Sequence, residues 1–210
     1  NAVKTFFRYL KQQNFITSDP SELVSHPKIE NSLPKFLTQI EYRALRDVSR
    51  SDSRIFAIIE LVLQTGIRIS EVASLKTKNL DGDSLTIEAY ATQPQRSIPL
   101  NQAVKNAVNL YTKNDRPKTD SPYIFVSKNS KPLAVRNIRA AVDRYMKKAQ
   151  IPSYSVNDLR TTFIIENLKA GVDLVLLSQV AGHKRLSTTQ RYLELAGAKE
   201  RGKKQSLQEL

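Results

Sequence analysis

A histidine and a tyrosine lie nine residues apart in the basic stretch AGHKRLSTTQRYLELAG, positions 181–197. A histidine can donate or accept a hydrogen bond near neutral pH, and an activated tyrosine oxygen can act as a nucleophile. Lys184 and Arg185 follow His183 directly, and further positive charge precedes Tyr192. Because cations attract anions, we expect this stretch to bind a phosphate.

Two other segments offer side chains suited to a phosphate. Arg68 lies in the turn TGIRIS between two expected helices, and NDLR places Asn157 and Arg160 three residues apart. Residues at this spacing share one face of a helix. Each of these residues alone has an ordinary alternative explanation, a surface charge for an arginine or a capping role for a histidine. Only their combination indicates a site.

The overall charge indicates a polyanionic partner. The chain has 210 residues, and 33 lysines and arginines against 20 acidic residues give a net charge of +13. Nucleic acid is the polyanion that we expect, whereas a solvated basic surface is the alternative.

Other classes of protein are excluded by composition. The chain has no cysteine, which excludes disulfides and thiolate zinc sites, and its two histidines are far apart, so we expect no metal and no cofactor. The apolar stretch 55–67 is interrupted by Glu60 and Gln64, so we expect no membrane segment and a cytoplasmic protein. The chain begins with Asn1, and its only methionine is Met146, so we expect a piece of a longer protein or a processed form.

Hydrophobic periodicity predicts the elements that must position these residues. The pattern predicts helices over 1–15, 38–49, 53–66, 70–80, 102–113, 134–150, 156–171, 172–182 and from 187 through Tyr192, and short strands over 85–90, 96–100 and 122–127. The expected fold is mainly α, with a small three-stranded antiparallel β-sheet. Proline-rich residues 16–38 read as a linker, with a domain boundary near 28–34.

Local signals set several of the expected boundaries. Thr38 with Glu41, and Ser187 with Gln190, match the capping-box pattern at a helix start. Gly66 predicts the C-terminal end of the helix before it. Pro99 must lie at a strand end or edge, because it has no N–H for the ladder.

Seven segments together resemble the tyrosine recombinases, the family of phage-integrase and Xer-type enzymes. They are TGIRISEVASL, NDLRTTF, AGH, STTQRY, RSIPLN, NSLPKFLTQIEYRAL and FFRYLKQQNFITSDPSELV. The resemblance implies a recombinase catalytic domain over 32–210. Residues 1–31 would then be the end of an upstream helical DNA-binding domain plus a linker.

The resemblance also implies a chemistry and a set of roles. It implies a site-specific DNA recombinase that cuts and rejoins double-stranded DNA through a 3′-phosphotyrosine, without metal or cofactor. The family acts as a homo-oligomer, a tetramer on two DNA duplexes; an accessory protein is not indicated by the sequence. By resemblance the site residues are the nucleophile Tyr192, the phosphate-binding Arg68 and Arg160, the phosphate-binding or tyrosine-positioning His183, and Asn157, with DNA contacts from Arg96, Lys184 and Arg185.

The chain departs from the family pattern at two positions. Asn157 stands where relatives commonly have histidine, although an amide can still donate a hydrogen bond to phosphate. Ala91 stands where the family has a hairpin lysine that protonates the leaving oxygen, and no lysine occurs between Lys78 and Lys105. Three alternatives remain open: a slow enzyme or one that takes its acid from elsewhere, an inactive DNA-binding relative, and a topoisomerase IB-like strand-nicking enzyme.

Overall fold

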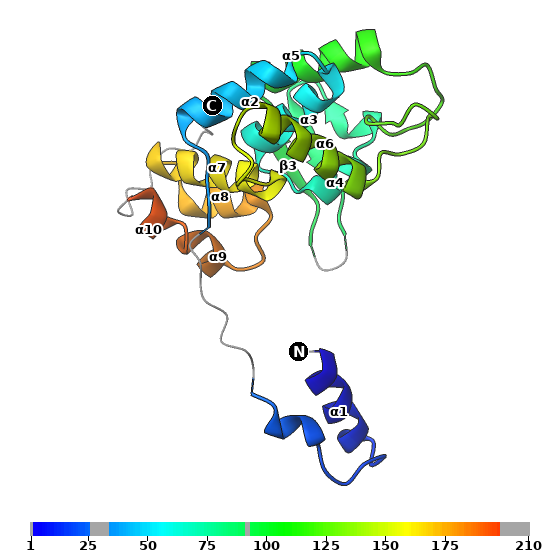
Figure 1. The fold of residues 1–210 in the computed structure, drawn as a ribbon, viewed down its shortest axis with the longest axis vertical. Coiled ribbons are helices and arrows are strands. Elements are labelled where there is room, and N and C mark those ends of the chain that lie inside the picture. The colour runs from blue at the N-terminus through cyan, green and yellow to red at the C-terminus, as the bar shows by residue number, and fades with distance from the viewer. Residues whose placement is uncertain (1, 26–33, 91–92, 198–210) are drawn as a thin grey trace. The chain divides into compact units, whose positions relative to one another are not determined.

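The computed structural model describes residues 2–25, 34–90 and 93–197 (Figure 1). The chain divides into two compact units, residues 1–33 and 34–210. Ala91 and the basic tail from 198 onward lie outside the described residues.

The first unit consists of two short helices. Helix α1 (Ala2–Gln12) is followed by the 3-10 helix η1 (Pro20–Leu23), whose N-terminus is capped by the Asp19 side chain. Phe6 and Phe7 meet edge to face, with ring centroids 5.6 Å apart. Every described residue of α1 is at least partly exposed.

Helix α3 (Ser53–Thr65) is the centre of the second unit. It packs against α2 (Gln39–Ser49), α5 (Gln102–Leu110) and α7 (Val156–Lys169). Nearly all of its residues are buried, most of them apolar, so burial stabilises it from several sides. The helix ends at Gly66, which has a left-handed φ of 63° and faces the ring of Phe163. The predicted stop at Gly66 and the predicted Thr38–Glu41 capping box of α2 are therefore confirmed.

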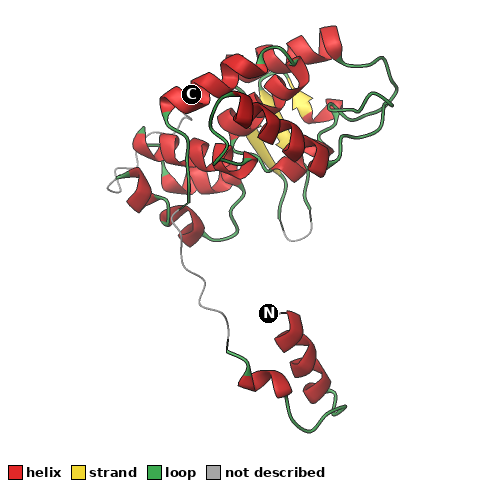
Figure 2. Cartoon of the chain, in the orientation of Figure 1, coloured by secondary structure: helices red, strands yellow, loops and turns green. Residues whose placement is uncertain are grey.

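The sheet has three antiparallel strands in the order β1-β2-β3, namely β1 (Leu80–Asp81), β2 (Ser84–Ile87) and β3 (Arg96–Pro99) (Figure 2). Leu85 pairs with Ile98 on the buried face. Pro99 ends the edge strand β3, as predicted.

The predicted strand over 122–127 was wrong, because the third strand is β1. Residues 122–127 form only isolated bridges, from Tyr123 to Lys76 and from Val126 to Pro132. Ile124, Phe125 and Val126 are fully buried, so their hydrophobicity reflects core packing rather than membership of a ladder.

The predicted helix over 70–80 is shorter in the structure. Helix α4 (Ile69–Ser74) stops where Leu75 becomes extended and its carbonyl accepts a hydrogen bond from the Ile124 N–H at 2.8 Å. The 3-10 helix η2 (Thr77–Asn79) follows and leads into β1. Helix α5 continues into a π-helical turn (Tyr111–Asp115), and α6 (Val135–Lys148) carries exposed basic residues.

Three helices form the C-terminal part of the described chain: α8 (Leu174–Ala181), α9 (Leu186–Gln190) and α10 (Leu193–Ala196). The predicted capping box of Ser187 and Gln190 was wrong. The N-cap of helix α9 is Arg185, two residues before Ser187, and it makes no side-chain cap hydrogen bond. Tyr192 consequently lies in the turn between α9 and α10 rather than inside a helix.

Within the described ranges, no helix has the length and apolar character needed to cross a membrane.

Candidate functional site

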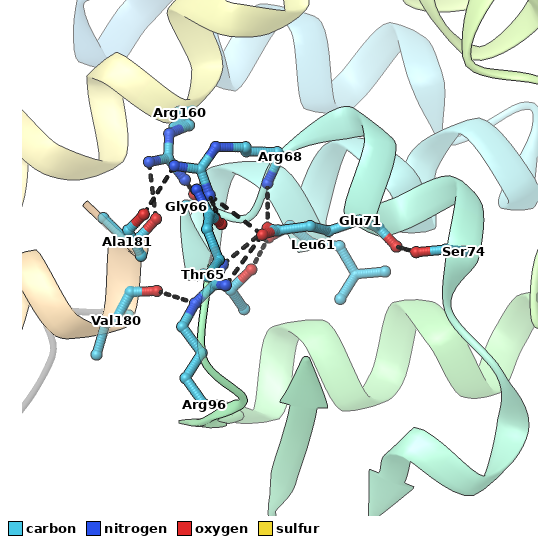
Figure 3. A network of polar contacts seen from close by, with 12 residues as sticks. Leu61, Thr65, Gly66, Arg68, Glu71, Ser74, Arg96, Arg160, Val180 and Ala181 are labelled. Atoms are coloured by element: carbon cyan, nitrogen blue, oxygen red, sulfur yellow. Dashed lines mark hydrogen bonds and ion pairs between the residues drawn. The ribbon is translucent and has the colours of Figure 1, made fainter. Parts of the chain in front are cut away.

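Glu71 on α4 connects two arginines from different elements (Figure 3). Its carboxylate accepts hydrogen bonds from both terminal nitrogens of Arg96 on β3, at 2.9 and 2.7 Å. The same carboxylate accepts a hydrogen bond from Arg68 Nη1 at 3.2 Å and another from the Arg68 backbone N–H at 2.8 Å. Burial alone would raise the pKa of Glu71, but the Arg96 hydrogen bond, the Arg68 N–H and both positive charges hold this pKa below its ordinary value. Glu71 is therefore an anion that fixes α4 to the sheet.

Three arginines converge on three consecutive carbonyls at the end of α8. The bonds join Arg96 Nε to Val180 O at 2.9 Å, Arg160 Nη2 to Ala181 O at 2.7 Å, and Arg68 Nη2 to Gly182 O at 2.7 Å. The last carbonyls of a helix lack intrahelical partners and carry partial negative charge. This helix end thus holds cations from α7, from β3 and from the start of α4 in one cluster (Figure 3).

Gly182 is required for this convergence. Its φ is 66°, in the left-handed region, and a Cβ added there would lie 2.8 Å from the Arg96 guanidinium carbon. A larger residue would therefore strain the backbone and displace Arg96.

Arg160 reaches the cluster from the first half of α7. Its Nη1 donates to the carbonyl of Gly66, at the end of α3, while Nη2 donates to Ala181. Burial, together with the nearby charge of Arg68, lowers the pKa of Arg160 to about 10. The guanidinium still carries its charge at neutral pH.

Arg68 has one further partner, from the hairpin between β2 and β3. Its Nη1 donates to the side-chain oxygen of Gln93 at 2.8 Å. Gln93 itself is held by a pair of backbone hydrogen bonds with Tyr90, of 2.9 and 3.1 Å, which close the hairpin. The hairpin is thereby anchored on Arg68.

His183 stands directly beyond the arginine cluster. Its Nδ1 lies 2.7 Å from the hydroxyl oxygen of Thr189, which is fully buried. Burial and the positive charges of Arg160, Arg68 and Arg96 lower the pKa of His183 to about 4. The imidazole is therefore neutral at physiological pH in the free protein.

Tyr192 completes the group. Its ring is nearly parallel to that of His183, with an interplanar angle of 12° and 6.3 Å between centroids. The side chain is half-buried against the core and interacts electrostatically with Arg160.

The structure thus brings together Arg68, Arg96, Arg160, His183 and Tyr192, which stand far apart in the sequence. It does not bring Asn157 into the cluster, although Asn157 lies one turn before Arg160 on α7. The Asn157 side chain is exposed.

Two clefts border the cluster. The first, of about 610 Å³, is lined by Arg68, Glu71 and residues of the hairpin up to Gln93; the second, of about 400 Å³, is lined by Arg96, His183 and residues of α8. Lys184 lies on the wall of both, as does Gln93. Lys184 and Arg185 are exposed.

Sequence reasoning missed Glu71, Gln93 and Thr189. Glu71 follows Arg68 by three residues on an expected helix, a spacing that predicts an ion pair and that was available in the sequence. No local pattern marks Gln93 or Thr189, because their roles depend on tertiary contacts. Within the described ranges, no group of three or more His, Cys, Asp or Glu side chains could hold a metal ion.

The sequence and the fold both match known proteins. Residues 35–199 match the model of the phage integrase family. The tyrosine recombinase XerC of Bacillus licheniformis is 31% identical over 208 residues, which cover 93% of this chain and 68% of that protein. XerA of Pyrococcus furiosus is 31% identical over 197 residues, covering 91% and 66%.

Solved structures of recombinases share the fold. A crystal structure of XerA recombinase superimposes with a TM-score of 0.71 at 26% identity, covering 91% of this chain and 68% of that one. The recombinase XerH, in a post-cleavage complex with palindromic difH DNA, gives a TM-score of 0.75 at 19% identity, covering 90% and 60%.

Proposed function

Because the chain belongs to the phage integrase family of tyrosine recombinases, we propose that it is a site-specific DNA recombinase that works through a 3′-phosphotyrosine intermediate. The observation that carries the proposal is the cluster at the end of α8. There Arg68 and Arg160 lie beside a neutral His183, which is stacked on Tyr192.

The two arginines would bind the scissile phosphate. A guanidinium offers paired donors in a plane and stays charged, so it suits the non-bridging oxygens, which gain charge in the transition state. Backbone carbonyls hold both terminal nitrogens of Arg160 and one terminal nitrogen of Arg68, so little reorganisation is needed when the phosphate arrives.

Tyr192 would attack the phosphorus, and His183 would assist it. In the tautomer that carries its hydrogen on Nδ1, His183 donates to Thr189, and its Nε2 presents a lone pair. That nitrogen accepts the phenol proton as the P–O bond to Tyr192 forms. The phosphodiester energy is stored in the protein–DNA bond, so rejoining needs no external energy source.

The remaining predicted residues have supporting or binding roles in this proposal. Arg96 is only 10% exposed and donates to Glu71 and Val180, which favours a positioning role over a contact with DNA. Lys184 and Arg185 are exposed next to the site and would contact the DNA backbone. Asn157 would approach the phosphate only after a change of rotamer or on DNA binding.

The assembly and setting are part of the same proposal. The partner would be double-stranded DNA, bound by a tetramer on two duplexes in the cytoplasm. A lambda integrase of the same fold crystallised as a dimer on a core DNA site. Residues 1–31 would be the end of an upstream DNA-binding domain, and 32–210 the catalytic domain.

A nicked suicide duplex tests the proposal. Cleavage beside the nick releases a short 5′-hydroxyl strand, which diffuses away and leaves the protein covalently attached to the DNA. We expect an adduct that survives denaturing electrophoresis. Binding without an adduct would indicate an inactive DNA-binding relative. This alternative is favoured by Ala91, which stands where the family has its hairpin lysine. Nicking and resealing of one duplex, without strand exchange between two, would indicate topoisomerase-like activity.

A further inference from the structure

Cleavage requires a proton for the leaving 5′-oxygen, and the hairpin has no lysine to supply it. An alkoxide is a poor leaving group, and general-acid help is typically worth ~10²–10⁴ in rate. The hairpin sequence between Lys78 and Lys105 contains no lysine. Any lysine that serves as the acid must therefore come from another element.

Lys184 is the lysine that the fold places in the first cleft, beside Arg68. Its side chain lines the first cleft together with Arg68 and the hairpin residues Tyr90 and Gln93. It follows His183 at the end of α8, so the carbonyl of Gly182, which binds Arg68, lies two residues before it. Among the described residues, no other lysine lines either of the two clefts at the arginine cluster.

Other lysines near the sheet are already paired. Lys76 and Lys78 both pair with Glu88, at 3.3 and 3.1 Å, and Lys105 pairs with Asp83 at 2.6 Å. An ammonium must leave such a carboxylate before it can approach a phosphate, at the small cost of breaking an exposed ion pair. Lys184 is exposed and, within the part of the chain that the structure describes, forms no ion pair.

The first cleft is bordered by Arg68 and Lys184 but not by the proposed nucleophile Tyr192. In an in-line displacement the attacking and leaving oxygens lie on opposite sides of the phosphorus. None of Tyr192, His183 and Arg160 lines the first cleft, although His183 and Lys184 both line the second. Arg68 borders that cleft and also binds the Gly182 carbonyl, so it connects the cleft to the arginine cluster.

We propose that Lys184 is the general acid of strand cleavage, taking the place of the missing hairpin lysine; this inference rests on the proposed recombinase function. As the Tyr192 oxygen forms its bond to phosphorus, the bond from phosphorus to the 5′-oxygen breaks. The Lys184 ammonium gives one proton to that oxygen, which leaves as a hydroxyl, and Lys184 becomes a neutral amine. The phenol proton passes to the neutral His183. In rejoining, the amine takes back the proton of the attacking 5′-hydroxyl.

The test compares two suicide duplexes, one with an ordinary 5′-oxygen at the scissile phosphate and one with a 5′-bridging sulfur. A thiolate leaves without protonation, so the sulfur substrate needs no acid. At protein concentrations that saturate DNA binding, we expect Lys184→Ala to cleave the oxygen substrate about 100-fold or more slowly than wild type and the sulfur substrate nearly as fast. Lys169→Ala is a matched control on the far part of α7, where Lys169 pairs with Glu166, and it should cleave both substrates like wild type.

The outcomes separate this inference from the proposed function. If the wild-type protein forms no adduct on the sulfur substrate, both the proposed recombinase function and the role of Lys184 are contradicted. If wild type forms the adduct, equal slowing of both substrates by Lys184→Ala assigns Lys184 to phosphate binding only and overturns the inference. Unchanged rates overturn it as well. If Lys78→Ala instead slows cleavage of the oxygen substrate but not of the sulfur substrate, Lys78 is the general acid and the inference is overturned.

Discussion

The imidazole of His183 lies nearly parallel to the phenol ring of Tyr192, with 6.3 Å between the ring centroids. His183 lies in the loop that follows α8, and Tyr192 lies in the turn between α9 and α10. Thr189 holds the imidazole from α9, at 2.7 Å from Nδ1. The short segment between the histidine and the tyrosine therefore fixes both rings relative to the arginines that bind the α8 carbonyls.

Replacing Tyr192 by phenylalanine should remove covalent trapping and leave DNA binding intact. The ring still packs against the core and against His183, so the site keeps its shape, but the nucleophilic oxygen is gone. Denaturing electrophoresis on a suicide duplex and a binding titration measure the two effects. An adduct formed by the Phe variant would identify another nucleophile.

His183 should remain neutral down to about pH 4 in the free protein. The chain has two histidines, so comparison with His183→Gln assigns its imidazole signal in an NMR pH titration. Bound DNA should raise the midpoint, because a nearby phosphate stabilises the imidazolium. A midpoint near 6.5 in the free protein would contradict the burial that the structure shows.

The same pKa change predicts how stability depends on pH. The folded protein binds the His183 proton less well than the unfolded chain, whose ordinary value is 6.5. The stability that neutral His183 contributes is therefore complete above about pH 6.5 and is lost as the pH falls towards 4. Thermal melts should show wild type losing more stability than His183→Gln over this window. Parallel losses would indicate that the histidine is not buried in solution.

Replacing Glu71 by glutamine should destabilise the fold and impair cleavage together. The change leaves the nearly buried Arg96 without a counter-charge, and removing one partner of a buried pair costs about 3 kcal/mol. Arg68 also loses its anchor on α4. Chemical denaturation and the suicide-duplex assay measure the two effects.

The matched control is Asp83→Asn, which removes an ion pair between exposed Asp83, in the turn between β1 and β2, and Lys105 on α5. This variant should show little change in either measurement. Equal effects of the two substitutions would mean that Glu71 does not organise the site.

Much of this site could be predicted from local sequence, because its parts lie at element boundaries with clear signals. Gly66, with its left-handed φ, and the Thr38–Glu41 capping box behave as their patterns indicate. The spacing of Asn157 and Arg160 did predict a shared helix face, but it could not show that only Arg160 turns into the cluster. That outcome depends on where the carbonyls of Gly66 and Ala181 lie.

The rest could not be predicted because backbone groups and distant partners determine it. The carbonyls at positions 180–182 accept three arginines through atoms that every residue type has, so no sequence pattern marks them. Gln93 meets Arg68 across 25 positions. The apolar run at 124–126 resembled a strand, since hydrophobicity alone does not distinguish a buried loop from a ladder.

DNA affinity should fall steeply with salt. Residues 184–204 contain seven lysines and arginines against two glutamates, and α6 presents exposed basic residues. Each phosphate contact releases counterions, so the logarithm of the affinity should fall linearly with the logarithm of the salt concentration. Arg185→Ala should reduce that slope by about 1 if Arg185 contacts one phosphate. A salt-independent affinity would exclude an interface dominated by the DNA backbone.

Restoring a lysine in the hairpin tests whether a lysine at position 91 and Lys184 both protonate the leaving oxygen. Ala91→Lys places an ammonium where the resemblance puts the family's acid, and it should raise cleavage of the oxygen substrate only modestly when Lys184 is present. In the Lys184→Ala background the same change should raise the rate by at least about 10-fold, allowing for imperfect placement against the usual general-acid effect. The sulfur-bridged substrate needs no proton and should be cleaved at similar rates by all four proteins. A gain of the same size in both backgrounds would mean that the two lysines act independently, so that Lys184 is not the acid. No gain in either background would mean that the hairpin register is wrong or that the acid is neither of the two residues.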